Sequence, residues 1–187
     1  PQAPAHGIDG RGAHVLVVEG WLDRSELDQA AALLRQGRYA QVLTSGGPID
    51  PLTDVGGWRN YAWRAASYLQ PLAPAGVSVI AVPAPDTPRD RTYLSAVRVR
   101  ERLGEAAALP DAIDIFSAGA HGRRSRMVYR MAFGPQVEVG VISAANPSFT
   151  ATRWWESSNG VKLVLGEAIA LGWTACCFWP PAPPRHP

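Results

Sequence analysis

The chain has 187 residues, 47% of them hydrophobic, so it is long enough for one domain with a substantial core and too short for two ordinary ones. Its formal net charge of +2 excludes a positive field over the whole surface, and we therefore expect no nucleic-acid partner. The two cysteines, Cys176 and Cys177, are adjacent, which leaves no metal-binding spacing and no disulfide framework, and their redox state stays open.

A single folded domain is predicted over residues 13–177. Residues 1–12 are rich in Pro and Gly and residues 178–187 are rich in Pro, so both are expected to be flexible tails. The chain opens at Pro1 and shows no secretion signal. We expect that an upstream segment has been trimmed away, and that such a segment could associate the native protein with a membrane.

Five short apolar segments alternate with helical patterns along the chain. Strands are predicted at 13–20, 40–47, 76–85, 112–120 and 136–143, and helices at 24–37, 58–69, 91–107, 123–133 and 158–175. Such alternation is typical of βαβ crossovers. It predicts a Rossmann-like, doubly wound three-layer α/β sandwich with a mostly parallel sheet of about five strands.

The longest apolar run lies near the end of the chain. It covers 12 residues at 168–179, whereas a helix needs about 20 apolar residues to span a bilayer. We therefore predict that this run belongs to a buried final helix.

In open parallel sheets, ligands bind beyond the carboxyl ends of the strands, so we expect the site residues in the segments that follow the predicted strands. Glu19 ends the first strand, where burial would raise its pKa and suit it to proton transfer; a helix-capping role is an equal alternative. Ser45, Gly46 and Gly47 end the second strand. Positive φ angles at the glycines would aim successive N–H groups at an anion, although an ordinary tight turn explains them too.

The segments before the third and fourth helices place cations where a helix dipole disfavours them. Asp90 is a candidate N-cap, and Arg91 and Thr92 follow it in the first turn. Arg123 and Arg124 open the next helix, together with Arg126. An anion in front of these helix N-termini would relieve the conflict, and pairing with Glu19 or Asp90 is the alternative.

Two more side chains complete the predicted site. His121 stands just before the predicted fourth helix, at a strand end, where it could act as an acid, a base or a hydrogen-bond donor. With one histidine there, no catalytic zinc is expected. Trp154 belongs to an adjacent tryptophan pair, of which one ring could line the site.

Several of these segments resemble the YdcF/SanA/ElyC-like bacterial family. "HVLVVEGW", "LTSGGP", "PAPDTPRDRTYLSA", "GAHGRRSR" and "RWWESSNGVKLVLGE" follow in the order of that family over residues 13–172. The family's Ser-Gly-Gly is matched by Ser45, Gly46 and Gly47, and its His-x-x-Arg by His121 and Arg124. Leu94 and Ser95 depart from it, since the family usually has an acid and an amide there.

The resemblance implies a Rossmann-like fold, a role in the cell envelope, and a nucleotide or S-adenosylmethionine as a ligand. Together with the residues, it leads to two hypotheses. One is an enzyme that acts on an anionic small molecule or envelope precursor by hydrolysis or group transfer, with Glu19 and His121 moving protons. The other is a non-catalytic module that senses a nucleotide or S-adenosylmethionine. The bacterial cytoplasm and the envelope both remain open as its compartment.

Overall fold

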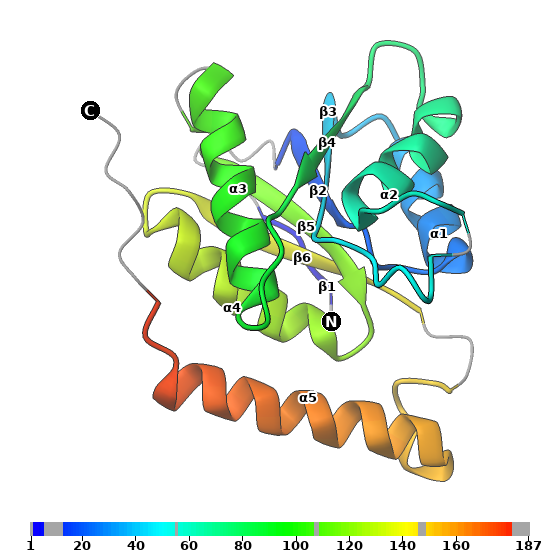
Figure 1. Cartoon of the computed structure of the whole chain (residues 1–187), viewed down its shortest axis with the longest axis vertical. Helices are drawn as coiled ribbons and strands as arrows, with labels where there is room; N and C mark the ends of the chain where they lie inside the picture. Colours follow the sequence, from blue (N-terminus) through cyan, green and yellow to red (C-terminus); the bar gives the residue numbers. More distant parts are fainter. Residues whose placement is uncertain (1, 6–12, 55, 107–108, 146–148, 181–187) are drawn as a thin grey trace.

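A six-stranded sheet lies between two layers of helices in the computed structural model, which describes residues 2–5, 13–54, 56–106, 109–145 and 149–180 (Figure 1). The strand order is β1-β6-β5-β2-β3-β4. All pairings from β6 across to β4 are parallel. The predicted doubly wound α/β sandwich with a mostly parallel sheet is confirmed.

The elements have the following bounds. The parallel strands are β2 (Val15–Glu19), β3 (Gln41–Gly46), β4 (Ser78–Pro83), β5 (Ala112–Ala118) and β6 (Glu138–Ala144). The helices are α1 (Arg24–Leu34), α2 (Tyr61–Leu69), α3 (Arg91–Ala106), α4 (His121–Phe133) and α5 (Ser158–Cys177). Two short 3₁₀ helices are η1 (Gln70–Leu72) and η2 (Trp154–Glu156).

The central strand β2 explains the apolar run that predicted it. Successive side chains of a strand point to opposite faces of the sheet. Leu16 and Val18 enter the core beneath α1 and α2, whereas Val15 and Val17 enter the core beneath α3 and α4. Because helices cover both faces, every residue of β2 is buried and no polar alternation is seen.

Helix starts follow local capping chemistry. Asp23 forms a capping box with Glu26, in which each side chain accepts a hydrogen bond from the other residue's backbone N–H at 2.9 Å. Ser157 caps α5, because its side-chain oxygen accepts a hydrogen bond of 3.1 Å from Gly160 N. α4 begins at His121, two residues earlier than predicted, and its N-cap Ala120 offers no side-chain acceptor.

The first residues of the chain add to the sheet. β1 (Gln2–Ala3), inside the segment expected to be a flexible tail, pairs antiparallel with β6. Ala5 N donates a hydrogen bond of 2.7 Å to the buried carboxylate of Asp114, which also accepts one from Tyr39. Because these partners are distant in sequence, no local pattern marked this strand. Residues 6–12 lie outside the described ranges.

The last helix is not the buried helix that its composition predicted. Only Gly160 and Thr174 of α5 are buried, and Figure 1 shows the helix outside the helix layer formed by α3 and α4. Within the described ranges, α5 is the one helix long and apolar enough to cross a membrane. The last two residues of α5, Cys176 and Cys177, are joined in a disulfide, and Phe178 just after the helix contacts Tyr93.

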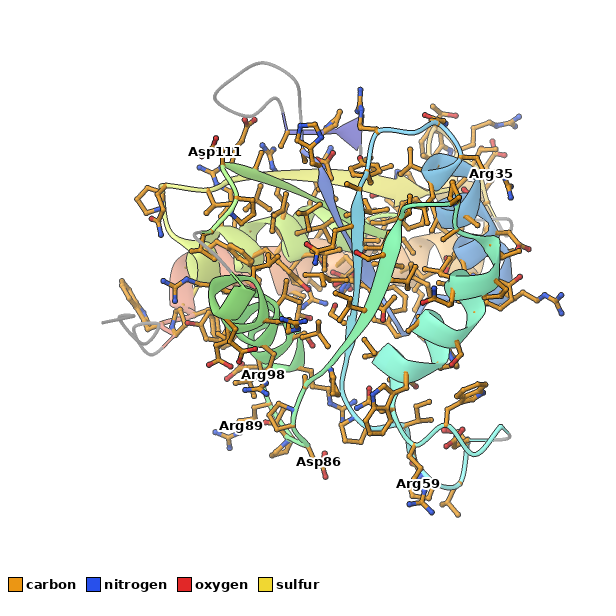
Figure 2. All side chains as sticks on the ribbon, turned by 90° about the horizontal axis from the view of Figure 1, so that it is seen from above. Arg35, Arg59, Asp86, Arg89, Arg98 and Asp111 are labelled. Atoms are coloured by element: carbon orange, nitrogen blue, oxygen red, sulfur yellow. A yellow bond between two sulfur atoms is a disulfide. The ribbon has the colours of Figure 1, made fainter. Side chains whose placement is uncertain are left out.

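The loops that follow the parallel strands gather at one edge of the sheet. Figure 2 shows Asp86 and Arg89, which follow β4, at one edge of the molecule, and Asp111, which precedes β5, at the opposite edge. The strands after β2 are added first on one side of it, as β3 and β4, and then on the other, as β5 and β6, so the parallel neighbours β2 and β5 mark the point where the strand order reverses. This switch point is where α/β sheets of this kind bind ligands.

Candidate functional site

A cavity of about 460 Å³ opens at this switch point. Its walls come from the ends of β2 to β5, from the first turns of α2, α3 and α4, and from α5. Seven of the predicted site residues line it: Glu19, Ser45, Gly46, Gly47, Arg91, Thr92 and His121. The structure thus brings together residues from four separate segments.

Glu19 is the most buried acid of the cavity, with 4% of its surface exposed. It ends β2 and accepts hydrogen bonds from Ser117 of β5 and, at 2.8 Å, from Ser125 of α4. Burial by itself would raise the pKa of Glu19, but His121 and the two serine hydroxyls outweigh it and lower the pKa. The predicted rise was therefore wrong, because that prediction considered burial without the partners that the fold brings.

His121 lies between two carboxylates. Its Nδ1 is 2.9 Å from Glu167 Oε1, and its Nε2 is 3.7 Å from Glu19 Oε1. Burial lowers the pKa of the imidazole, but Glu19 and Glu167 overcome this effect and raise the pKa to about 9. The raised pKa favours the charged form of the ring at neutral pH, while Arg124 Nη2 also lies 2.9 Å from Nδ1.

The Nε2 atom of His121 is buried and forms no hydrogen bond with any described residue. The edge of the His121 ring meets Trp21 at a centroid distance of 5.0 Å, and both side chains line the cavity. Buried polar atoms are nearly always hydrogen-bonded, so an unpaired N–H next to a cavity is a place where a ligand atom can be accepted.

Glu167 is a site residue that the sequence motifs did not predict. It reaches the site from α5 and binds Arg124 as well as His121, with 2.9 Å between Arg124 Nε and Glu167 Oε2. Burial would raise the pKa of Glu167, but His121 and Arg124 lower it to about 2. A usable signal existed, because Glu167 is the only acid in the 20 residues of α5. An ionised group in an apolar helix needs a partner.

The arginines of the "HGRRSR" segment do not converge on one anion. Arg124 is held by Glu167, and Arg126 donates to Val139 O at 2.8 Å. Arg123 lines a second cavity of about 780 Å³ with Trp154, while Asp90 and Arg124 line a third of about 350 Å³. The expected alternative was pairing of these arginines with Glu19 or Asp90, but Arg124 pairs with Glu167 instead.

Arg91 is the cation that lines the main cavity as well as the third one. It is the first residue of α3 and lies exposed, where its Nε donates to Thr87 O at 3.3 Å. Asp90 before it has a φ of 57°, in the left-handed region, rather than the extended conformation usual for an N-cap residue. Asp is among the residues that tolerate this region best.

Gly20 and Gly46, at the ends of β2 and β3, serve close packing rather than an anion-binding turn. Neither Gly46 nor Gly47 has a positive φ, which removes the basis of the predicted nest. Instead, the start of α2 approaches closely: a Cβ on Gly46 would lie 2.7 Å from the Tyr61 Cβ, and one on Gly20 would collide with Tyr61 O. Small residues here let α2 form one wall of the cavity.

Among the described residues, no group of three or more His, Cys, Asp or Glu side chains is placed to hold a metal ion. Searches against protein-family models and against curated proteins find no match for this chain. The evidence for a ligand or a reaction at this site therefore comes from its own residues.

Proposed function

We propose that the chain is an α/β domain that binds an anionic small molecule or envelope precursor in the main cavity and acts on it by hydrolysis or group transfer. His121 is the general acid, and Glu19 stabilises its charged form. The resemblance to the YdcF/SanA/ElyC-like family is part of this proposal, as is the role in the bacterial envelope.

The proposal depends on the buried Nε2 of His121, a residue that lines the cavity: this atom lies 3.7 Å from Glu19 Oε1 and forms no hydrogen bond with a described residue. Glu167 holds the opposite ring nitrogen and so orients the ring. Glu19 keeps the proton on the ring until a reaction draws it away, since its carboxylate favours the charged imidazole. A positioned acid of this kind can protonate a leaving group.

Two features favour an anionic group near His121. The first turn of α4 has no side-chain cap, so its free N–H groups and the helix dipole attract negative charge. Two of the acids in the wall do not oppose this, because Glu19 and Glu167 are each balanced by His121 or Arg124, and Glu26 accepts a hydrogen bond in the capping box of α1. Arg91, at the start of α3, supplies a further cation in the lining.

The rest of the cavity favours a ligand that also has an apolar part. Trp21, Tyr61, Phe149 and Leu163 line it, and 40% of the Trp21 surface is exposed. A lipid-linked or aromatic molecule with an acidic head matches such a wall better than a free inorganic anion does.

The non-catalytic alternative has its own support. Both oxygens of Glu19 already accept hydrogen bonds from serines, so this carboxylate is well satisfied as a structural group. The Trp21 ring next to the cavity could stack on the base of a nucleotide or of S-adenosylmethionine. In that case the cavity senses its ligand without turning it over.

Binding and turnover measurements separate the two functions. The protein is screened by thermal shift against nucleotides, S-adenosylmethionine, phosphomonoesters and undecaprenyl-phosphate sugars, and phosphate or ester release is followed for each compound that binds. His121→Gln is compared with His14→Gln, a matched change of an exposed histidine outside the cavity. We expect turnover to fall at least about 100-fold in His121→Gln while ligand affinity changes much less.

A parallel loss of affinity and turnover in His121→Gln would favour the sensing module. Binding of a ligand without any turnover in the wild type would do the same. Ligand binding that survives unchanged in His121→Gln and in Arg91→Gln would move the site away from this cavity.

A further inference from the structure

The outward surface of α5 is apolar over most of its length. Leu165, Ile169 and Trp173 form this surface, with exposed fractions of 49%, 74% and 53%, and Leu163, at 41%, lies at its border with the main cavity. We call Leu165, Ile169 and Trp173 the apolar face of α5. A core helix of similar composition would be mostly covered, whereas only 11% of the apolar stretch of α5 is buried.

One of the two charges of α5 lies off this face, and the other lies on it, one turn before Leu165 at the N-terminal end. Lys162 and Glu167 are the only charged residues of the helix. Glu167 turns toward the domain, where it binds His121 and Arg124. Lys162 is exposed and stands at the N-terminal end, so the exposed positions from Leu163 to Cys177 include no charge. This distribution is complementary to the uncharged interior of a bilayer bordered by anionic headgroups.

Tryptophans lie at both ends of the helix. Trp155 precedes it with 58% of its surface exposed, and Trp179 follows it with 87% exposed. Trp173 is in the last two turns. Exposed indole rings are unfavourable in water but are enriched where headgroups meet acyl chains, because one end of the ring is apolar and the other can donate a hydrogen bond.

We propose that α5 docks the domain on a lipid bilayer, lying parallel to the membrane surface with its apolar face in the boundary between headgroups and acyl chains. The contacts of Glu167 support the parallel orientation. They hold the middle of the helix on the domain through His121 and Arg124, and a helix that crossed the bilayer would break them and carry the carboxylate into hydrocarbon.

A second copy of the chain fits this face less well than a bilayer does. Side chains that are about half exposed present on the order of 100 Å² each, so three of them offer roughly 300 Å². A stable dimer buries about 800 Å² on each partner. A bilayer sets no such minimum, and the tryptophans at both helix ends add to its contact.

Vesicle flotation with the full chain tests the proposal. The probe is vesicles of phosphatidylcholine with phosphatidylglycerol, and the variants are Ile169→Glu and Trp173→Ser. Matched controls change equally exposed apolar residues elsewhere: Leu52→Glu, at 94% exposure, and Trp63→Ser, at 49%. We expect vesicle affinity to fall about tenfold or more in the two α5 variants, because they place a charge or remove a ring at the acyl boundary, and to stay unchanged in the controls.

Three results would overturn the proposal. The first is a wild type that does not float with vesicles, or that floats equally well after Ile169→Glu. The second is a dimer in sedimentation equilibrium that Ile169→Glu dissociates, without vesicle binding by the wild type; the face would then bind a second copy. The third is protection of the residues after α5 from protease by sealed vesicles, which would mean that the helix spans the bilayer. Unchanged circular dichroism of each variant shows that the fold is intact.

Discussion

The helices α4 and α5 are neighbours, yet one is buried against the sheet and the other is largely exposed. α4 is amphipathic and buries Gly122, Ser125, Val128, Tyr129, Ala132 and Phe133 against the sheet and α3. α5 is more apolar in composition but buries only Gly160 and Thr174. Apolar content alone therefore did not decide which helix entered the core.

A helix is therefore buried in the core because its apolar residues form one stripe, and its total apolar content matters less. A stripe can be covered completely by one sheet face, while an apolar circumference needs partners on all sides. Where α4 and α5 meet, Glu167 of α5 forms ion pairs with His121 and Arg124 of α4. Three measurements test whether α4 is buried and α5 exposed in solution.

Truncation of one large side chain in each helix should give the largest effect. Phe133→Ala should reduce the free energy of unfolding by about 3–5 kcal/mol, because it opens a cavity in a fully buried position. Ile169→Ala, with the side chain 74% exposed, should change it by less than about 0.5 kcal/mol. Urea unfolding at constant pH measures both. Similar losses for the two variants would show that α5 is covered in solution and would contradict the contrast.

The next effect in size is the dependence of stability on pH. The pKa of His121 is raised from 6.5 to about 9, so its stabilising contribution is complete below about pH 6.5 and is lost as the pH rises through 9. The contribution is on the order of 3 kcal/mol. Glu167, whose pKa is lowered from 4.5 to about 2, contributes above pH 4.5 and loses that contribution as the pH falls toward 2.

These two contributions share one ion pair and so cannot be added. Thermal unfolding between pH 5 and pH 10 should show a decrease in Tm on the alkaline side that His121→Gln removes and His14→Gln keeps. An alkaline decrease that is the same in all three proteins would assign it to other groups.

The smallest effect concerns the link between the two helices. Glu167→Gln keeps the size and hydrogen-bonding shape of the side chain but removes its charge, so the pKa of His121 should fall by about one unit, equivalent to about 1.4 kcal/mol. Glu105→Gln, which changes an exposed acid at the far end of α3, should leave it unchanged. Histidine ring signals in NMR, assigned with His121→Gln, report this pKa. An unaltered pKa in Glu167→Gln would mean that α5 does not hold this position in solution.

Much of the fold could be predicted because its signals are local. The valine-rich run at β2, the cap at Asp23 and the alternation of strands with helices each depend on a few neighbouring residues. Two features could not be predicted in this way. β1 depends on pairing with β6, and the exposure of α5 depends on how much surface the other helices had already covered.

In the candidate site too, residues with a local sequence signal could be predicted, and residues that depend on distant contacts could not. Glu19 and His121 were found because a polar residue directly after an apolar strand is visible in the sequence. Ser117, Ser125 and Glu167 were missed because each matters only through its contact with one of those two residues. The direction of the pKa shift of Glu19 was wrong for the same reason, since it depends on partners brought from β5 and α4.

By itself, the sequence determined the parallel α/β architecture and the edge of the sheet where the polar residues meet, because strand order in βαβ folds follows from connection length and handedness. Only the tertiary structure decided which charges pair, and therefore that the charged form of His121 is favoured and that Arg124 is held by Glu167. The physical reason is distance. A helix dipole or a burial cost can be read from local sequence, but ion pairing depends on a few ångströms between residues 43 positions apart.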